Sequence, residues 1–373
     1  MLLGGGLAVM VAQGTGRFIL TPVLPGMQAE AGLDASAAGL LGSLNFAGYL
    51  LGAVAVSVLP GLRPALLIRM GLALVVLAAL AMMPTTDLGW WLCARFLAGL
   101  GGALLFLGGV VAATSGLAAA GRIDLAGHIF VGVGIGIILG AVAALIVMPD
   151  WRLGWLVMAV AGAVALPWIA RLDSGVGAVT ATPGRLTIGR PLLRVALAYA
   201  MGGFGFGAGT TFFVRVFSEN DPTHATMAWL VAGIIAAPST AVWTAAASRY
   251  GTIRALMAAL ILHGIGLGLV AYSRGLVPMA IAGVLIGGTF MGVTALSLAF
   301  ARSTVPEAPA QASAFVTGVF GLGQVLGPMI AGHLLDWSGA ALALTVPALA
   351  TMVGALALVP DLSPPPASSR PRV

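Results

Sequence analysis

The sequence contains no lysine, one cysteine and few charged residues of either sign. Charged residues make up 8% of its 373 positions, against about 25% in soluble domains. Cys93 alone can form no intrachain disulfide and gives no metal-ligand spacing. The Gly-x-Gly repeats cannot act as a phosphate-binding loop of the GxxxxGK type, because there is no lysine to complete it. A soluble domain, a disulfide scaffold, and metal or cofactor chemistry are therefore not expected.

Apolar residues dominate what is present. Hydrophobic residues account for 60% of the chain, and its mean hydropathy is +1.08. A membrane-spanning helix needs roughly 20 consecutive, mainly apolar residues. The stretches that meet this requirement are residues 2–25, 36–59, 65–84, 88–115, 127–148, 153–171, 192–217, 225–247, 254–273, 275–301, 310–335 and 340–360. The sequence thus predicts an all-α membrane protein with twelve transmembrane helices, the first kinked or broken near its end by Pro22 and Pro25.

The arginines outside these spans lie mainly on one side of the predicted membrane. Of the 17, twelve fall on the side of the two chain termini, two fall on the other side, and three lie within spans. Cytoplasmic loops retain positive charge, so both termini are expected in the cytoplasm. The cytoplasmic set is Arg63, Arg69, Arg122, Arg171, Arg185, Arg190, Arg194, Arg249, Arg254, Arg302, Arg370 and Arg372.

The longest polar interval, residues 172–191, divides the chain near its midpoint and is expected to be a cytoplasmic linker. The halves on either side contain similar segments. LGAVAALIVMPDW in the fifth span corresponds to LGPMIAGHLLDW in the eleventh, which pairs Asp150 with Asp336. Transporter halves related in this way enclose a site at the middle of the membrane. The expected organisation is two pseudo-symmetric six-helix bundles, residues 1–171 and 192–360, followed by a cytoplasmic tail, residues 361–373, whose composition predicts disorder.

Several motifs resemble those of the major facilitator superfamily. RFLAGLGG in the fourth span is similar to its Arg-x-x-x-Gly-x-Gly signature, and GVFGLGQVLGPMIAG in the eleventh is similar to its Gly-rich motif. SRYGTIR, which begins at Ser248, resembles its cytoplasmic loop motif but lacks the usual aspartate, and the Gly-rich motif of the fifth span has Ala141 in place of proline. The opening GTGRFILTPVLP further resembles the bacterial YbfB/YjiJ-like branch. The resemblance covers essentially the whole chain and implies a monomeric secondary transporter that works by rocking of its two bundles.

Arg17 lies deep in the first span, with no other charge between Met1 and Met27. An ionised guanidinium at such depth costs at least about 2.5 kcal/mol, so it must face a wet cavity, a neighbouring helix or a ligand. The resemblance implies a second cavity-side arginine at Arg95, whereas no carboxylate lies at mid-depth in any span. Since a guanidinium pairs well with carboxylate, phosphate or sulfonate, this pattern favours an anionic cargo. The alternative is that helix ends and backbone carbonyls satisfy both arginines.

Further polar residues on the expected cavity-forming helices are candidates for the same site. Gln13, Arg17 and Thr21 are spaced by four residues and lie along one face of the first helix, and Asn45 and Tyr49 share that spacing on the second. Each could instead form a hydrogen bond between helices without touching cargo. The predicted substrate-binding residues are Arg17, Arg95, Gln13, Thr21, Asn45, Tyr49, Thr210 and Thr211.

Proton coupling and helix movement are assigned to other groups. His333, near the outer end of the eleventh span, is the candidate for proton coupling, whereas His263 in the ninth span is expected to be structural. Small residues let helices approach closely, and the resemblance implies that the fifth and eleventh helices cross the opposite half and slide. The packing and conformational set is Gly132, Gly136, Gly140, Gly323, Gly327, Pro328, Arg63, Arg249 and Arg254.

These observations favour a secondary active transporter that moves a small organic anion across the inner (plasma) membrane by alternating access. Symport and antiport are both left open. The alternative is an efflux exchanger for neutral or hydrophobic compounds. An intramembrane enzyme is disfavoured because the spans contain no Ser/His/Asp or paired-carboxylate set, and a receptor is disfavoured because no loop is long enough to form a signalling domain. The expected partners are the substrate, the lipid bilayer and protons, and no cofactor or nucleic acid is expected.

Overall fold

The computed structural model describes residues 1–59, 61–173, 186–219 and 221–362. Within these residues, twelve helical segments are long and apolar enough to cross a membrane. The spans are Leu2–Ala31, Ala35–Val58, Pro64–Ala81, Leu88–Ala119, Ile123–Val147, Trp151–Ala170, Arg190–Ser218, Pro222–Tyr250, Thr252–Tyr272, Leu276–Thr304, Pro309–Ser338 and Ala340–Leu362. The predicted all-α architecture is confirmed. Most of the predicted linker and nearly all of the predicted tail lie outside the described residues.

The first half of the chain forms six spans. The first span consists of α1 (Leu2–Met10), the π-helix η1 (Val11–Phe18) and α2 (Leu20–Ala31). The others are α3 (Ala35–Val58), α4 (Pro64–Ala81), α5 (Leu88–Ala119), the 3-10 helix η2 (Ile123–Phe130) joined to α6 (Val131–Val147), and α7 (Trp151–Ala170).

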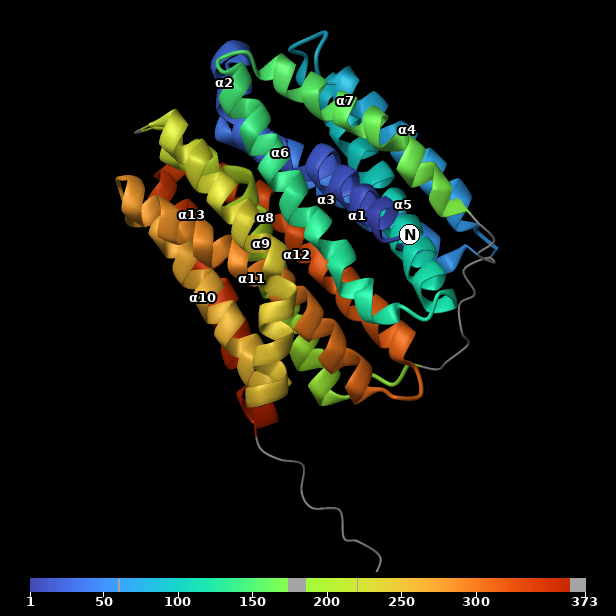
Figure 1. Cartoon of the computed structure of the whole chain (residues 1–373). Coiled ribbons are helices and arrows are strands. Elements are labelled where there is room, and N and C mark those ends of the chain that lie inside the picture. The colour runs from blue at the N-terminus through green and yellow to red at the C-terminus, as the bar shows by residue number, and fades with distance from the viewer. Residues whose placement is uncertain (60, 174–185, 220, 363–373) are drawn as a thin grey trace, which may run out of the picture.

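The second half also forms six spans. They are α8 (Arg190–Ser218), α9 (Pro222–Tyr250), α10 (Thr252–Tyr272), α11 (Leu276–Thr304), α12 (Pro309–Ser338), and α13 (Ala340–Leu356) with the 3-10 helix η4 (Val359–Leu362). The two halves form two six-helix bundles, coloured blue to green and yellow-green to red in Figure 1. In the first bundle α5 packs against α3 and α4, and in the second α8 packs against α12 and α13.

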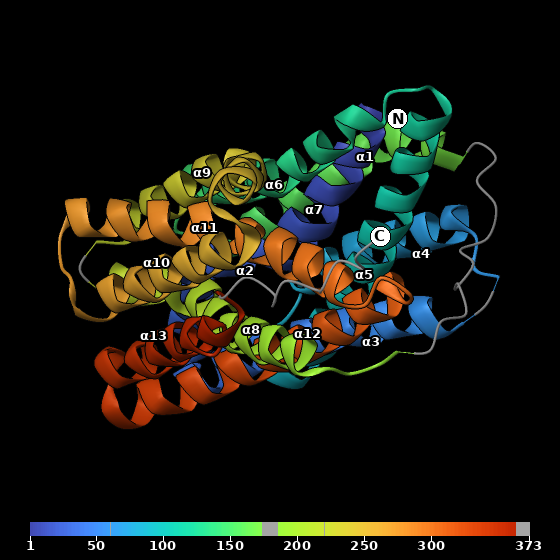
Figure 2. The same ribbon diagram turned by 90° about the horizontal axis from the view of Figure 1, so that it is seen from below.

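Two helix pairs make the most extensive contacts between the bundles. In Figures 1 and 2, α6 lies beside α9 and α12 lies beside α3, and these pairs are in direct contact. Glycine permits the close approach. A Cβ atom on Gly39 of α3 would overlap the carbonyl oxygen of Pro328 on α12, and a Cβ on Gly134 of α6 would meet the carbonyl oxygen of Gly233 on α9. The fifth and eleventh spans therefore do cross the opposite half.

The glycines predicted to serve that crossing contact helices of their own half. Gly132 lies against backbone atoms of α1, Gly136 lies against backbone atoms of α1 and η1, and Gly140 lies against the residue that joins η1 to α2. Gly323 and Gly327 lie against backbone atoms of α8. These glycines pack within their own half, and close contact with the opposite half comes from the positions named above; a role in helix movement stays a prediction.

The first span also differs from its prediction. It ends at Ala31, beyond the predicted end at residue 25, and Pro25 lies inside α2 without ending the helix. The irregularity occurs earlier, in η1, where the N–H of Ile19 bonds to the carbonyl of Gly14 at 3.0 Å. A bond over five residues defines a π-helical turn, which is rare and frequently found at functional sites.

Close packing at Gly323 gives a stability prediction. Gly323→Ala should lower the free energy of unfolding by about 1 to 3 kcal/mol, because its Cβ would overlap the carbonyl oxygen of Ala200. Gly318→Ala on the same helix is the matched control, since nothing lies within 4 Å of that Cβ. This control should be neutral or stabilise by roughly 0.5 to 1 kcal/mol. Thermal unfolding of both variants in detergent measures the difference, and equal melting temperatures would contradict the packing described here.

Candidate functional site

The end of the π-helix η1 is held by two side chains from neighbouring helices. Asn45 of α3 donates from Nδ2 to the carbonyl of Gly16 (2.8 Å) and to that of Arg95 (3.0 Å). Arg95 of α5 donates from Nη1 to the carbonyl of Gly16 and from Nη2 to that of Arg17, both at 3.3 Å. Backbone carbonyls inside a membrane need such partners, because no bulk water is present to supply them. The two side chains fix the backbone at the residue that carries the buried charge.

Arg95 therefore contacts helix backbone with two of its nitrogens. The residue is 2% exposed, and its guanidinium carbon lies 5.6 Å from the ring centroid of Trp155. Its Nε has no hydrogen-bond partner. The structure places Arg95 as a support for Arg17, and direct contact between Arg95 and cargo stays a prediction.

Arg17 is surrounded by aromatic rings and has no acidic partner. Its guanidinium carbon lies 4.7 Å from the ring centroid of Phe46 and 4.3 Å from that of Tyr49. Its Nε and Nη2 are buried without hydrogen-bond partners. No ion pair among the described residues involves Arg17. Cation–π contacts contribute about 0.5 to 2 kcal/mol, but they leave those two donors without a hydrogen-bond acceptor.

Arg17 lines a central cavity of about 210 Å³ between the two bundles. Both halves contribute polar groups to it, namely Gln13, Arg17 and Tyr49 from the first and Tyr199, Thr294, Thr317 and Gln324 from the second. The described lining includes no Asp or Glu. The Nε2 of Gln324 is a further buried donor without a partner. The cavity reaches toward the face at which α3 and α11 end and α12 begins, here called the N-terminal face because α1 also begins there.

The remaining predicted site residues surround a small void on the other side of Arg17. This void, of about 10 Å³, has room for no more than about one water molecule. Its polar lining consists of Arg17, Thr21, Asn45, Arg95, Thr210 and Thr211. The eight residues predicted from the sequence are thus brought together around one arginine, with Gln13 and Tyr49 at the cavity and the others at the void.

Sequence reasoning missed Gln324, which supplies a free donor from the second bundle. It lies in the motif GLGQVLGP of the eleventh span, where it is the lone polar side chain among small and apolar residues. A single polar residue in an apolar helix could have marked Gln324 as a candidate. The sequence could not show that its side chain points into the cavity, because the face that a helix turns toward a cavity depends on packing between the bundles.

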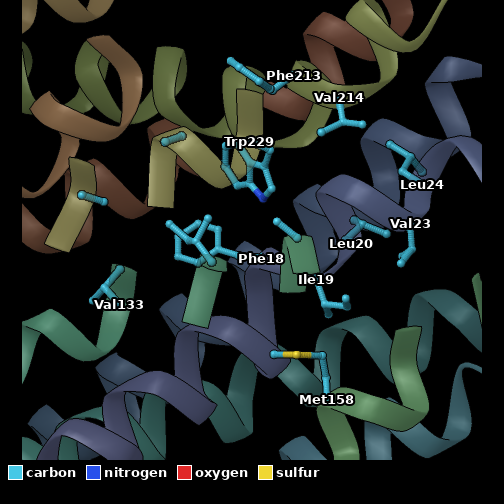
Figure 3. Close-up of a cluster of buried hydrophobic side chains, with 14 of the residues drawn as sticks. Phe18, Ile19, Leu20, Val23, Leu24, Val133, Met158, Phe213, Val214 and Trp229 are labelled. Carbon is cyan, nitrogen blue, oxygen red and sulfur yellow. The ribbon is translucent and has the colours of Figure 1, made fainter. Parts of the chain in front are cut away.

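An aromatic cluster lies beside Arg17 at the interface between the bundles. Phe18 comes from the first bundle, and its ring centroid lies 6.2 Å from that of Phe206, 6.0 Å from that of Phe290 and 6.2 Å from that of Trp229. Figure 3 shows Phe18 and Trp229 facing one another among buried apolar side chains. Consecutive residues of the π-helix thus face different surroundings. Arg17 lines the cavity, whereas Phe18 packs against the opposite bundle.

Hydrogen bonds between the bundles lie toward the distal face, at which α2 ends and α3 begins. Thr21 donates to the carbonyl of Thr210 at 2.5 Å, and Ser43 donates to the carbonyl of Val325 at 2.6 Å. Both bonds join a helix of the first bundle to one of the second. They join the bundles on the distal side of Arg17, whereas the central cavity lies on its other side.

Asp336, near the end of α12, joins the two bundles at the distal face. Its carboxylate accepts from the backbone N–H groups of Ala35 (2.8 Å) and Ser36 (2.7 Å), at the beginning of α3, and from the Ser36 hydroxyl at 2.5 Å. A carboxylate at this position satisfies free N–H groups and complements the helix dipole. The sequence-related Asp150 instead caps its own helix through the N–H of Arg152 at 3.0 Å. It borders a mainly apolar distal cavity of about 380 Å³ between the bundles.

The other predicted functional residues lie away from the cavity. His333 is exposed on α12, about one turn before Asp336. Arg63, Arg249 and Arg254 are exposed at the N-terminal face. Their roles in proton coupling and conformational change stay predictions.

Two six-helix bundles that enclose a cavity at the level of a buried arginine define a membrane transporter of the major facilitator type. The chain belongs to the family described as uncharacterised MFS-type transporter YbfB, which matches residues 9–359. The resemblance stated from the sequence is thereby confirmed, and the protein is a transporter that is embedded in a membrane and moves a small molecule across it. No curated protein gives a significant sequence match.

Solved structures show the same fold. The nucleoside transporter NupG superposes with a TM-score of 0.75 at 13% identity, covering 98% of this chain and 100% of its own. A mutant of NupG gives a TM-score of 0.76, also at 13% identity, over 97% of this chain and 100% of its own. The human organic anion transporter MFSD10 (TETRAN) gives 0.64 at 16% identity, over 96% of this chain and 98% of its own. At these identities the likeness establishes the fold and nothing about cargo.

Proposed function

We propose that the protein carries a small organic anion across the cytoplasmic membrane by alternating access, and that Arg17 binds the anion. The observation that carries this proposal is the pair of buried, unpartnered donors on Arg17, Nε and Nη2, in a residue that lines the central cavity. A guanidinium presents its N–H groups in a planar fork that matches the two oxygens of a carboxylate, phosphate or sulfonate. The free Nε2 of Gln324 adds a donor from the opposite bundle.

Charge balance supports an anion over a cation. The described lining of the cavity carries the arginine charge and no acidic residue. A cationic cargo would meet an uncompensated positive charge in a medium of low dielectric, where like charges repel strongly. An anion would instead neutralise Arg17 and remove the energetic penalty of an unpaired buried charge.

The remaining lining restricts the size and shape of the cargo. Aromatic rings from both bundles surround Arg17, and a volume of about 210 Å³ suits a small organic molecule and not a large one. The aromatic lining residues are Phe46, Tyr49, Phe106, Tyr199, Phe206, Phe290 and Phe320. A ring attached to one anionic group would satisfy both kinds of surface, because aromatic rings pair favourably with one another.

The arrangement of open and closed regions supports alternating access. The central cavity extends toward the N-terminal face, and the bonds made by Thr21, Ser43 and Asp336 hold the bundles together on the distal side of Arg17. The distribution of arginines supports a cytoplasmic position for both termini by the positive-inside rule. In that orientation, which is part of the proposal, this conformation exchanges cargo with the cytoplasm. We also propose that the domain boundary follows the predicted division near residues 172–191.

A ligand panel tests the proposal directly. The purified protein in detergent is heated with benzenesulfonate, with phenyltrimethylammonium as the cation of similar ring size, and with benzamide as the neutral analogue. Benzenesulfonate should raise the melting temperature, since a ligand at 100 times its Kd stabilises by about 2.7 kcal/mol. The other two should have no effect. Stabilisation by the cation and none by the sulfonate would contradict the proposal.

A second candidate function, exchange of neutral or hydrophobic compounds, is favoured by one observation. Phe46 and Tyr49 already cover Arg17 with their rings, which offsets part of its charge without any ligand. In this case benzamide would stabilise the protein as strongly as benzenesulfonate. The same panel therefore separates the two functions.

A further inference from the structure

We infer that His263, buried behind the aromatic wall of the central cavity, binds and releases the proton that accompanies the anion during transport. The inference rests on the proposed anion transport. It replaces the sequence-based expectation that His263 is a hydrogen-bonded structural residue.

The contacts of Thr289 favour one tautomer of His263. His263 of α10 is 2% exposed, and its Nδ1 lies 2.8 Å from the Thr289 hydroxyl oxygen on α11. The same oxygen lies 2.7 Å from the carbonyl oxygen of Leu285. A hydroxyl that donates its single proton to this carbonyl accepts from the imidazole, and Nδ1 then carries the proton of the neutral ring. This tautomer, in which Nε2 has an unprotonated lone pair, is part of the inference.

The Nε2 lone pair has no donor. This atom is buried without a hydrogen-bond partner. It borders a void of about 10 Å³ whose other lining residues are Gly202, Phe206, Leu260, Phe290, Val293 and Phe320. A buried acceptor without a donor is unfavourable, and each such group in a native structure calls for a role. The void holds at most about one water molecule, so a proton, directly or through that water, can reach Nε2 but an organic ligand cannot.

No charged side chain of the described residues neutralises or competes with this imidazole. The helices packed against α10 are α8, α9, α11 and α13, together with η4. On α8 the titratable side chain on this side is Tyr199, whose ring stacks on Phe320 at 4.0 Å between centroids. The charged groups of these elements lie near helix ends. They are Arg190, Arg194 and Arg215 on α8, Arg249 and His224 on α9, Arg302 on α11, and Asp361 of η4, which pairs with Arg194. Protonation of His263 in this conformation would create a buried charge without a partner, so the ring would gain a proton only in a conformation that exposes it to water or to a negative charge.

The wall between His263 and the central cavity is shared with the anion site. Phe206, Phe290 and Phe320 line both spaces. Phe206 lies 6.4 Å from the His263 ring and 6.2 Å from that of Phe18, between ring centroids. Phe18 follows Arg17 directly in η1, so an anion that shifts Arg17 relative to the second bundle also shifts the ring that supports this wall. Opening of the wall would let water deliver a proton to Nε2, and the anion beside Arg17 would partly compensate the new charge.

Transport measurements in proteoliposomes test this inference with benzenesulfonate, an anion that stays ionised and so cannot carry the proton itself. The wild-type protein should accumulate radiolabelled benzenesulfonate when the outside is acidic, and it should also exchange it without a pH gradient. His263→Gln should reduce gradient-driven accumulation at least tenfold and leave the exchange intact, since exchange requires no net proton movement. His128→Gln, an exposed residue of η2, is the control and should retain both activities.

The outcomes distinguish the inference from the function on which it rests. If His263→Gln retains gradient-driven accumulation, or if His333→Gln abolishes it instead, the inference is wrong and anion transport stands. If the wild type neither binds nor transports the sulfonate, the proposed function is wrong.

A measurement that needs no cargo then determines which nitrogen of the His263 ring carries the proton. The ¹⁵N spectrum of histidine-labelled protein, assigned with His263→Gln, should show Nδ1 protonated and Nε2 bare at neutral pH. A proton on Nε2 in the neutral ring would overturn the inference in every case.

Discussion

Replacing Arg17 with glutamine is expected to weaken the binding of benzenesulfonate by roughly 10- to 100-fold, because a hydrogen bond to a charged group contributes about 1.5 to 3 kcal/mol. The ligand-free protein should not lose stability. Arg17 has buried nitrogens without partners and no carboxylate beside it, so its removal takes an unpaired charge out of the membrane interior. Isothermal titration and thermal unfolding of the purified variant measure the two effects separately. Loss of binding together with unchanged or raised stability distinguishes a ligand-binding arginine from a structural one.

Two further variants define the contribution of the guanidinium. Arg17→Lys retains the positive charge but not the planar fork, so its affinity should fall between those of the wild type and the glutamine variant. Arg215→Gln is the matched control, because Arg215 pairs with Glu219 at 2.8 Å near the distal end of α8 and does not line the cavity. Its affinity for the sulfonate should equal that of the wild type. If Arg17→Gln binds as tightly as Arg215→Gln, Arg17 is not the anion site.

The sequence was sufficient to predict the twelve spans and the central position of Arg17. Both follow from the energetics of the bilayer, which allows few charges in a helix and makes each exception conspicuous. The spacing of Gln13, Arg17 and Thr21 also placed them on one side of the first span, and the structure brings all three to the spaces that adjoin the guanidinium. Local periodicity within one helix was therefore informative.

The parts that the sequence did not predict depend on contacts between helices. The π-helix η1 arises where Asn45 and Arg95 hold the carbonyl of Gly16, and neither contact follows from the local sequence GTGRF. The orientation of Gln324 toward the cavity depends in the same way on packing between the bundles. Nothing in the ninth span indicated that the His263 ring contacts the Thr289 hydroxyl of the next helix at 2.8 Å. In each case a side chain on another helix determines what the residue can do.

The second large effect is expected at Asp336, whose carboxylate joins the bundles at the distal face. Asp336→Ala removes the acceptor for the N–H groups of Ala35 and Ser36, and the loss of such a cap costs about 0.5 to 2 kcal/mol. A change of 1 to 2 kcal/mol shifts a two-state ratio by about 5- to 30-fold, here toward conformations open at the distal face. Asn can also cap a helix, so Asp336→Asn should shift the ratio less.

Distances between spin labels measure this shift. Thr86→Cys and Arg274→Cys place labels on exposed distal loops of the two bundles, and Cys93→Ser removes the native thiol. Asp336→Ala should increase the population with the longer distance between the labels. Asp34→Ala is the matched control, since Asp34 caps the same helix through the N–H of Ala37 at 2.7 Å but belongs to the first bundle. Both variants weaken the beginning of α3, and only one removes a bond between the bundles. An equal shift in both variants would mean that the stability of the α3 N-terminus, and not the hydrogen bonds between the bundles, controls distal opening. A shift confined to Asp336→Ala would show that this carboxylate holds the two bundles together at the distal face.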